Sequence, residues 1–301
     1  MYVITGATGH IGSKVADILL ARGDKVRVMG RSKDRLRRFA VKGAEIAVGD
    51  LRDSTFVTKA FRGAEAVFAM IPPNYGAKDF RAYQNEIGAS LATAISDGNV
   101  THVVNLSSQG ADLWAGSGPI IGLRDQEERL NTLHGVDIVH LRPTYFMENL
   151  FNTIPLIRKF GFAGSAIRGD LSFAMIATRD IAAHVAVLLV NRDFSGIAIK
   201  DLLGQRDLTM EEAVRVIGRA IGRPDLKYVQ FSHDDAARGM REMGIGADAA
   251  RLFIEMSMAL NEGRFAVGRQ RTADNTTPTS IEEFADTFAE VFTASAVLEA
   301  A

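Results

Sequence analysis

The chain has 301 residues, of which 47% are apolar and 24% are charged, so it is long enough to build a full hydrophobic core. Its 35 lysines and arginines nearly balance 36 aspartates and glutamates, which removes the global positive field that would hold it to a nucleic acid or an anionic membrane. The sequence contains no cysteine, which excludes disulfides, thiolate metal sites and cysteine nucleophiles.

The first 145 residues alternate predicted strands and helices. The predicted strands cover residues 2–5, 25–29, 44–48, 66–70, 102–106 and 136–141. The helices predicted between them lie near residues 10–22, 33–41, 54–61, 78–97 and 120–133. Because these strands are nearly unbroken apolar runs, the α/β pattern predicts a doubly wound parallel sheet of the Rossmann type, covered by helices on both faces.

After Pro143 the pattern changes to short apolar segments separated by glycines. Residues 178–190 still predict a helix, and residues 197–200 predict a short strand that can return to the main sheet. Capping boxes that begin at Thr209 and Ser280 predict two amphipathic helices. We therefore expect a dinucleotide-binding Rossmann domain formed by residues 1–145 with about 171–200, and a smaller, mixed substrate-binding region formed by residues 146–170 and 201–301.

The sequence pattern does not favour a membrane, metal or serine-hydrolase function. The longest strongly apolar helix-like run, residues 181–190, is too short to span a bilayer, and no secretory signal opens the chain. The histidines lack zinc-ligand spacing, and no G-x-S-x-G motif is present. We expect a cytoplasmic protein that has no membrane segment, binds no metal and does not contact nucleic acid directly.

A glycine-rich loop, Thr5-Gly6-Ala7-Thr8-Gly9-His10-Ile11-Gly12, joins the first predicted strand to the first predicted helix. In this context Gly6 can turn sharply out of the strand, Gly9 lets the backbone approach a pyrophosphate, and Gly12 permits close contact between helix and strand. The free N–H groups and the helix dipole attract phosphates. The predicted dinucleotide-binding residues of this loop are Gly6, Thr8, Gly9, His10, Ile11 and Gly12. We assign His10 a positional role and not a catalytic one.

The residues after the second predicted strand, Gly30-Arg31-Ser32-Lys33, favour NADP(H) over NAD(H). An NAD-selective site carries an acidic residue about 20 residues beyond the glycine loop. Arg31 can instead make a bidentate contact with a 2′-phosphate, to which Ser32 can add a hydroxyl and Lys33 a second charge. The next basic residues, Arg35, Arg37 and Arg38, fit the solvated face of a helix better than a binding site.

Other candidate site residues follow the later strands, at the edge of the sheet where doubly wound folds bind their ligands. Ile71 follows the fourth strand, Ser107 closes the fifth, and Pro143 and Tyr145 follow the sixth. We expect Ile71, Ser107 and Pro143 to line the cofactor, although turn or cap chemistry explains Ser107 equally well. Trp114, in a loop of small residues, can flank the substrate or mark a contact with a protein partner.

Three later segments carry a resemblance to a known family: residues 118–130, residues 141–150 with the sequence Leu-Arg-Pro-Thr-Tyr-Phe-Met-Glu-Asn-Leu, and residues 275–284. Together with the glycine loop, they resemble the NmrA-like family of atypical short-chain dehydrogenases/reductases and its quinone-reductase branch. The likeness spans essentially the whole chain. It implies a Rossmann fold that binds NAD(P)H, with quinone reduction in some relatives and cofactor sensing without turnover in others.

The chain departs from ordinary short-chain dehydrogenases at the catalytic positions. Those enzymes use a Tyr as general acid with a Lys four residues later, and none of the tyrosines here has a Lys at that distance. Counted back from Glu128, the family's usual Lys falls on Arg124 and the conventional Tyr falls on Ile120. Arg124 can anchor a ribose or an anionic substrate but cannot release a proton near neutral pH. The catalytic residues therefore stay unassigned, with Arg124 and Tyr145 as the candidates near the substrate.

The family likeness also assigns Asp50, which precedes Leu51, to the adenine amino group, and capping of the next helix is the alternative. Our first hypothesis is an NADPH-dependent oxidoreductase that reduces a quinone or a similar electron-poor acceptor, because charge delocalises over such a ring and water can supply the proton. The alternative is a redox sensor that binds NADP(H) and acts through a protein partner. The protein can also form a homodimer, which the sequence does not decide.

Overall fold

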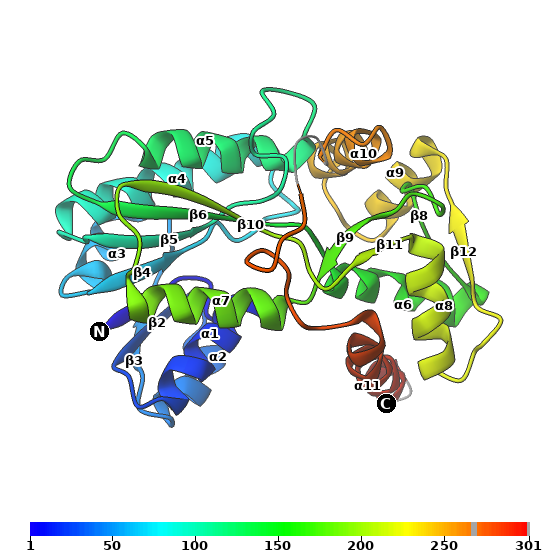
Figure 1. Cartoon of the computed structure of the whole chain (residues 1–301), viewed down its shortest axis with the longest axis horizontal. Helices are drawn as coiled ribbons and strands as arrows, with labels where there is room; N and C mark the ends of the chain where they lie inside the picture. The colour runs from blue at the N-terminus through cyan, green and yellow to red at the C-terminus, as the bar shows by residue number, and fades with distance from the viewer. Residues whose placement is uncertain (266–269, 300–301) are drawn as a thin grey trace. The chain divides into compact units, whose positions relative to one another are not determined.

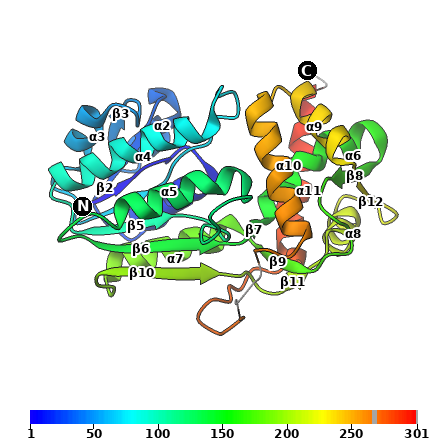
Figure 2. The same cartoon turned by 90° about the horizontal axis from the view of Figure 1, so that it is seen from above.

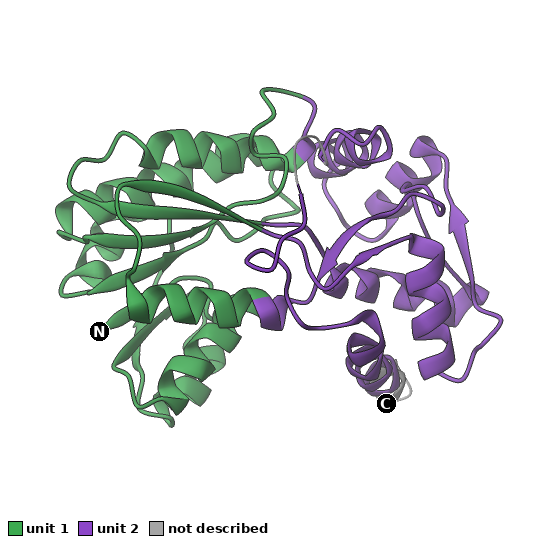
Figure 3. Ribbon diagram, in the orientation of Figure 1, with its two compact units in different colours: residues 1–115, 119–142, 181–201 green, residues 116–118, 143–180, 202–301 purple. Residues whose placement is uncertain are grey.

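The computed structural model describes residues 1–265 and 270–299, and the chain divides into two compact units (Figure 3). Unit 1 comprises Met1–Ala115, Pro119–Arg142 and Ile181–Asp201. Unit 2 comprises Gly116–Gly118, Pro143–Asp180 and the chain from Leu202 onward. Each unit is therefore assembled from three separate segments of the sequence.

Unit 1 is built on a seven-stranded sheet. In spatial order its strands are β10 (Ile197–Leu202), β6 (Asp137–Pro143), β5 (His102–Leu106), β4 (Ala66–Ala69), β1 (Tyr2–Ile4), β2 (Val26–Gly30) and β3 (Glu45–Val48). All the neighbouring pairs from β6 to β3 run parallel. The predicted doubly wound sheet is confirmed, and β10 does return to it, beside β6 (Figure 2).

Helices cover both faces of this sheet (Figure 1). One face carries α3 (Ser54–Phe61), α4 (Phe80–Asp97) and α5 (Ile121–Leu130), the last preceded by the short helix η1 (Gly118–Ile120). The other face carries α1 (His10–Ala21), α2 (Lys33–Ala40) and α7 (Thr178–Asn191). Phe61 of α3, Leu91 of α4 and Val103 of β5 belong to one buried core cluster, and each such side chain contributes roughly 1.5–3 kcal/mol through its burial.

Unit 2 contains a three-stranded and a two-stranded sheet. The first has the order β11 (Asp207–Leu208), β9 (Phe173–Ile176) and β7 (Tyr145–Phe146), and the second pairs β12 (Lys227–Gln230) with β8 (Phe162–Ser165). The helices of this unit are η2 (Met147–Thr153), α6 (Ile154–Phe160), α8 (Met210–Ala220), α9 (His233–Glu242), α10 (Ala247–Asn261) and α11 (Ile281–Glu299). Its core is mainly aliphatic and includes an aromatic cluster, in which the ring of Phe151 lies 5.5 Å from that of Phe284 and 5.8 Å from that of Phe288.

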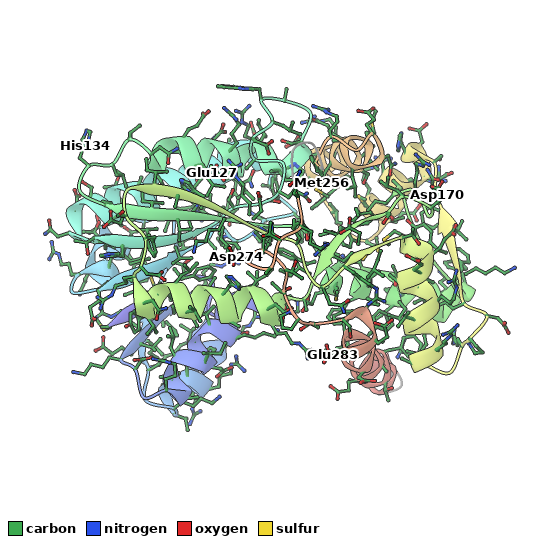
Figure 4. All side chains as sticks on the ribbon, in the orientation of Figure 1. Glu127, His134, Asp170, Met256, Asp274 and Glu283 are labelled. Carbon is green, nitrogen blue, oxygen red and sulfur yellow. The ribbon has the colours of Figure 1, made fainter. Side chains whose placement is uncertain are left out.

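Two helices of unit 2 begin at the predicted capping boxes. Thr209 Oγ1 accepts from the Glu212 N–H at 3.0 Å, and the Glu212 carboxylate accepts from the Thr209 N–H at 2.8 Å. Ser280 and Glu283, the latter labelled in Figure 4, exchange the same pair of hydrogen bonds at 3.1 and 2.9 Å. Both predictions are confirmed.

The start of α7 is stabilised by two carboxylates of unit 2. Glu148, from the segment that resembles the NmrA-like family, accepts from the Thr178 N–H at 3.0 Å and from the Thr178 hydroxyl. Asp180, in the first turn of α7, accepts from the Thr279 N–H at 3.0 Å and from the Thr279 hydroxyl at 2.6 Å. The Glu-Asn motif of the family-like segment therefore has a structural role here, because Glu148 satisfies a donor that the helix start leaves without a partner.

His140, on β6, is a fully buried neutral histidine. Its Nδ1 accepts from the Asn105 side-chain amide at 3.0 Å, and its Nε2 donates to Asn131 Oδ1 at 2.8 Å. This arrangement needs the tautomer with its proton on Nε2. Burial lowers the pKa of His140 from 6.5 to about 4.

We expect His140 to make the stability of the protein depend on pH. The unfolded chain takes up this proton near pH 6.5 and the folded chain only near pH 4, so stability is complete above pH 6.5 and decreases as the pH falls through this window. The expected loss between pH 7 and pH 4.5 is on the order of 2–3 kcal/mol. Urea unfolding across this range measures it. His140→Gln should flatten the curve and exposed His233→Gln should not; equal curves for the wild type and His140→Gln would contradict the assignment.

Candidate functional site

The predicted cofactor residues of unit 1 lie at one edge of the sheet. Because β1 to β6 are parallel, their carboxyl ends point the same way, and the loops that follow them lie at that edge. The glycine loop follows β1, Arg31 follows β2, Asp50 follows β3, Ile71 follows β4 and Ser107 follows β5. Pro143 is the last residue of β6.

The glycine loop is tied to the neighbouring strand by Thr5. The buried Thr5 hydroxyl donates to Phe68 O at 3.0 Å and accepts from the Met70 N–H at 2.9 Å. Gly6 follows with a φ of 61°, and a Cβ at this position would lie 2.1 Å from Met70 Sδ. The positive φ therefore favours glycine at the turn out of the strand, and a side chain there would also displace the Met70 side chain.

The start of α1 lies close against this loop. A Cβ on Gly12 would lie 2.5 Å from Gly6 O, whereas a Cβ on Gly9 would meet only Gly6 O, at 3.4 Å. Gly9 is the N-cap of α1, and within the described residues no side chain caps this helix end. The N–H groups of Ile11 and Gly12, in the first turn of α1, are thus donors that can face an anion. Thr8 is half-buried, Ile11 is buried and His10 is exposed in this loop.

Arg31, Ser32 and Arg35 form the start of α2. Arg31 is exposed, and the Ser32 hydroxyl is the N-cap that accepts from the Arg35 N–H at 3.4 Å. The Arg35 guanidinium donates to Thr8 O at 3.1 Å and so reaches the glycine loop. Arg35 and Arg38 both lie on the exposed face of the helix, as the sequence predicts. Arg38 pairs there with Asp17 on α1, whereas the contact of Arg35 with the glycine loop is not predictable from the sequence.

Asp50 does not cap the next helix. Its carboxylate accepts from the Arg52 side chain at 2.8 and 3.2 Å, and this hydrogen bonding lowers the pKa of Asp50. Asp53 caps α3 instead, accepting from the Phe56 N–H at 3.1 Å. The capping interpretation of Asp50 is therefore wrong, while its contact with adenine stays a prediction. Leu51 is half-buried beside it and packs on the core of unit 1.

Ser107 stands at the end of β5, directly after the last residue of the strand. Its N–H donates to Leu141 O at 2.8 Å, but its buried Oγ has no hydrogen-bond partner within residues 1–265 and 270–299. A buried polar group without a partner costs roughly 1–3 kcal/mol. Such an atom is typical of a place where a bound polar molecule completes the hydrogen bonding. Ile71, by contrast, is buried in the apolar core.

Arg124 is held by unit 1 itself. It donates to the carbonyl oxygens of Ala111 at 3.4 Å and Asp112 at 3.1 Å, and it pairs with Glu128 one turn later on α5. Its guanidinium lies 3.6 Å from the centre of the Trp114 ring. These contacts fix the loop between β5 and α5.

Tyr145, the second catalytic candidate, belongs to unit 2. Its ring packs edge-to-face on Phe173 at 5.5 Å, and burial raises the pKa of its hydroxyl. It is thus a weaker acid than an exposed tyrosine.

A buried ion pair that the sequence did not reveal lies between α5 and β6. Arg142 Nε donates to one carboxylate oxygen of Glu127 at 2.9 Å, and Arg142 Nη2 donates to the other oxygen. Both side chains are at most 10% exposed. Glu127 is labelled on α5 in Figure 4. The only sequence signal for this pair is the arginine before Pro143, which belongs to the segment that resembles the NmrA-like family.

The described part of the chain contains no cluster of three or more histidines, aspartates or glutamates able to hold a metal ion. None of the described helices is long and apolar enough to cross a membrane.

Comparison with known proteins identifies relatives along most of the chain. The sequence model of the NmrA-like family matches residues 2–285. An NAD(P)H azoreductase from Xenophilus azovorans is 27% identical over 260 residues, which cover 85% of this chain and 86% of the relative.

Solved structures show the same fold. The complex of an NADPH-dependent quinone oxidoreductase from Escherichia coli with NADPH superposes with a TM-score of 0.78 and 19% identity, covering 96% of this chain and 99% of that one. The triphenylmethane reductase of a Citrobacter species in complex with NADP(H) gives a TM-score of 0.75 at 17% identity, covering 96% and 100%.

Proposed function

Because this chain belongs to the NmrA-like family, we propose that it is an NADPH-dependent oxidoreductase that reduces a quinone or a similar electron-poor acceptor. The observation that carries this proposal is the cradle at the carboxyl edge of the sheet. It combines tightly packed Gly6 and Gly12, the open backbone at Gly9, and the unpartnered buried hydroxyl of Ser107. A dinucleotide fits this combination, because its phosphates can lie at the glycines and one of its polar groups can bind the Ser107 hydroxyl.

In this proposal each part of the cofactor has its own residues. The N–H groups of Ile11 and Gly12 bind the pyrophosphate, and Thr8 and Ile11 shape the loop around it. Arg31, with the Ser32 hydroxyl, binds the 2′-phosphate, and Arg35 supports it from its contact with Thr8 O. Asp50 and Leu51 border the adenine. Ile71, Ser107 and Pro143 border the nicotinamide, which supplies a hydride when bound in its reduced form.

The choice of a conjugated acceptor rests on the catalytic acid that the chain lacks and on the compounds for which its relatives are named. Ile120 and Arg124 stand where a conventional site has its acid and its lysine, and Arg124 cannot donate a proton near neutral pH. Reduction of a conjugated acceptor needs no strong acid in the protein, because water can protonate the delocalised product. The relatives named for azo compounds, quinones and triphenylmethanes act on conjugated acceptors of this kind.

The direct test is NADPH oxidation by the pure protein with quinones, azo dyes and aldehydes as acceptors. We expect turnover with quinones or azo dyes and little with aldehydes. The second candidate function, an NADP(H)-binding sensor that acts through a protein partner, is favoured by the contacts that commit Arg124 to its own loop. Tight cofactor binding without turnover of any acceptor would support the sensor and reject the enzyme.

Cofactor preference is tested by charge reversal at Arg31. Arg31→Glu should lower the ratio of kcat/KM for NADPH to that for NADH by about 10- to 100-fold, because charge-assisted hydrogen bonds to the 2′-phosphate are lost and repulsion replaces them. Arg37→Glu is the matched control, since it makes the same charge change on an exposed residue of α2. The assignment of Arg31 fails if both variants keep the wild-type ratio.

A further inference from the structure

Trp114 is the only tryptophan in the sequence, and its side chain is unusually exposed. It is 80% exposed in the loop between β5 and α5, which leaves the ligand edge of the sheet directly after Ser107. Tryptophan is normally among the more buried residues, because its ring offers a large apolar surface. A planar ligand bound at this loop would bury that surface.

Within residues 1–265 and 270–299, the ring of Trp114 is held on one face by Arg124. The Arg124 guanidinium lies 3.6 Å from the ring centre, and hydrogen bonds to Ala111 O and Asp112 O hold that guanidinium in place. Arginine stacked in this way restrains the indole without enclosing it. With one face on Arg124 and an exposed fraction of 80%, the indole keeps its other face in solvent.

The surroundings of Trp114 fit a small flat ligand better than a protein interface. Its exposed sequence neighbours in the loop are Asp112 and Ala115, and neither adds a large apolar side chain beside the ring. A stable protein interface needs about 800 Å² from each partner and a packed apolar centre. A single rigid ring face suits one planar molecule.

We propose that the open face of Trp114 is a stacking platform that selects planar acceptors with two or more conjugated rings over single-ring ones. This inference rests on the proposed function, since it names the acceptor class for the same site. Offset stacking on a preorganised ring gains affinity without loss of side-chain freedom. The Arg124 contact makes Arg124 a positioning residue for the platform.

The unique tryptophan makes the proposal measurable without turnover. Intrinsic emission of the wild-type protein is titrated with a two-ring naphthoquinone and with a one-ring benzoquinone, in the presence of NADP⁺. We expect saturable quenching by the naphthoquinone at concentrations near its KM, and only linear, collisional quenching by the benzoquinone. Linear quenching by both would overturn the proposal.

Kinetics give the second measurement. Trp114→Ala should raise the KM for the naphthoquinone about tenfold, with a smaller effect on kcat, and should change the KM for the benzoquinone less than twofold. The naphthoquinone KM of Trp114→Phe should lie between those of the wild type and Trp114→Ala. Arg124→Gln should weaken the preference for the naphthoquinone over the benzoquinone, because the indole loses its support. Phe160→Ala, which removes an exposed ring from unit 2, is the control and should match the wild type.

The outcomes separate the platform from the function. Turnover with an unchanged naphthoquinone KM in Trp114→Ala would reject the platform and keep the enzyme. Saturable quenching without turnover would keep the platform and reject the enzyme. A homodimer that dissociates in Trp114→Ala but not in Phe160→Ala would show that the ring binds a second copy, and would overturn the proposal.

Discussion

Gly9→Ala is expected to weaken NADPH binding about 10- to 100-fold while leaving the stability of the free protein within about 0.5 kcal/mol of the wild type. Gly9 has a φ of −95°, which alanine adopts readily, and its Cβ would make only an ordinary contact of 3.4 Å with Gly6 O. The new methyl group would instead occupy the space in which the pyrophosphate approaches the backbone. The substitution therefore separates cofactor binding from folding.

Gly12→Ala is the contrasting variant. Its Cβ would lie 2.5 Å from Gly6 O and 2.9 Å from Thr5 O, and these backbone atoms cannot rotate away. We expect a loss of about 1–3 kcal/mol in the free energy of unfolding as well as weaker NADPH binding.

Titration of NADPH fluorescence measures the affinities, and urea unfolding without cofactor measures the stabilities. If Gly9→Ala binds NADPH as tightly as the wild type, the pyrophosphate does not lie on this loop.

The second large effect is expected at the buried ion pair. Arg142→Met should lower the free energy of unfolding by about 3–5 kcal/mol, because it leaves the buried Glu127 carboxylate without its partner. Removal of both charges, in Arg142→Met with Glu127→Leu, should recover much of this loss, since the desolvation of the carboxylate is then removed as well. A double-mutant cycle by urea unfolding at pH 7 gives the coupling between the two side chains.

Arg81 provides a matched pair that is less buried. It binds Asp125 through two hydrogen bonds of 2.7 and 2.8 Å, much as Arg142 binds Glu127, but the Arg81 side chain is 52% exposed and that of Asp125 is 16% exposed. Arg81→Met should therefore cost only about 0–1 kcal/mol, because the Asn85 side-chain amide still donates to the Asp125 carboxylate at 3.0 Å. Equal losses in Arg81→Met and Arg142→Met would show that burial is not what makes the Arg142 pair important.

The sequence predicted the sheet well because its signals are local and periodic. Apolar runs separated by helices define the parallel strands, and the glycine spacing needs only one strand and one helix as context. The capping boxes at Thr209 and Ser280 were predictable for the same reason, since each involves residues three positions apart.

The missed features depend on contacts between distant residues. Arg35 and Thr8 are 27 residues apart, and no periodicity relates them. Arg142 and Glu127 meet only because α5 packs on the strand that follows it. Two aspartates, Asp50 and Asp53, lie within four positions before α3, and the sequence does not decide which of them caps the helix. The geometry selects Asp53, which lies three residues before Phe56 and accepts from its N–H.

The position of β10 has a consequence for the order in which the protein can be made. Its residues 197–202 complete the sheet of unit 1 beside β6, although residues 143–180 of unit 2 are synthesised between these two strands. During translation β6 therefore emerges as an unpaired edge, able to pair with other chains, until about 60 more residues have followed it. At a rate of roughly 5–20 residues per second this exposure lasts several seconds, a period in which a chaperone that shields strand edges would raise the yield of folded protein.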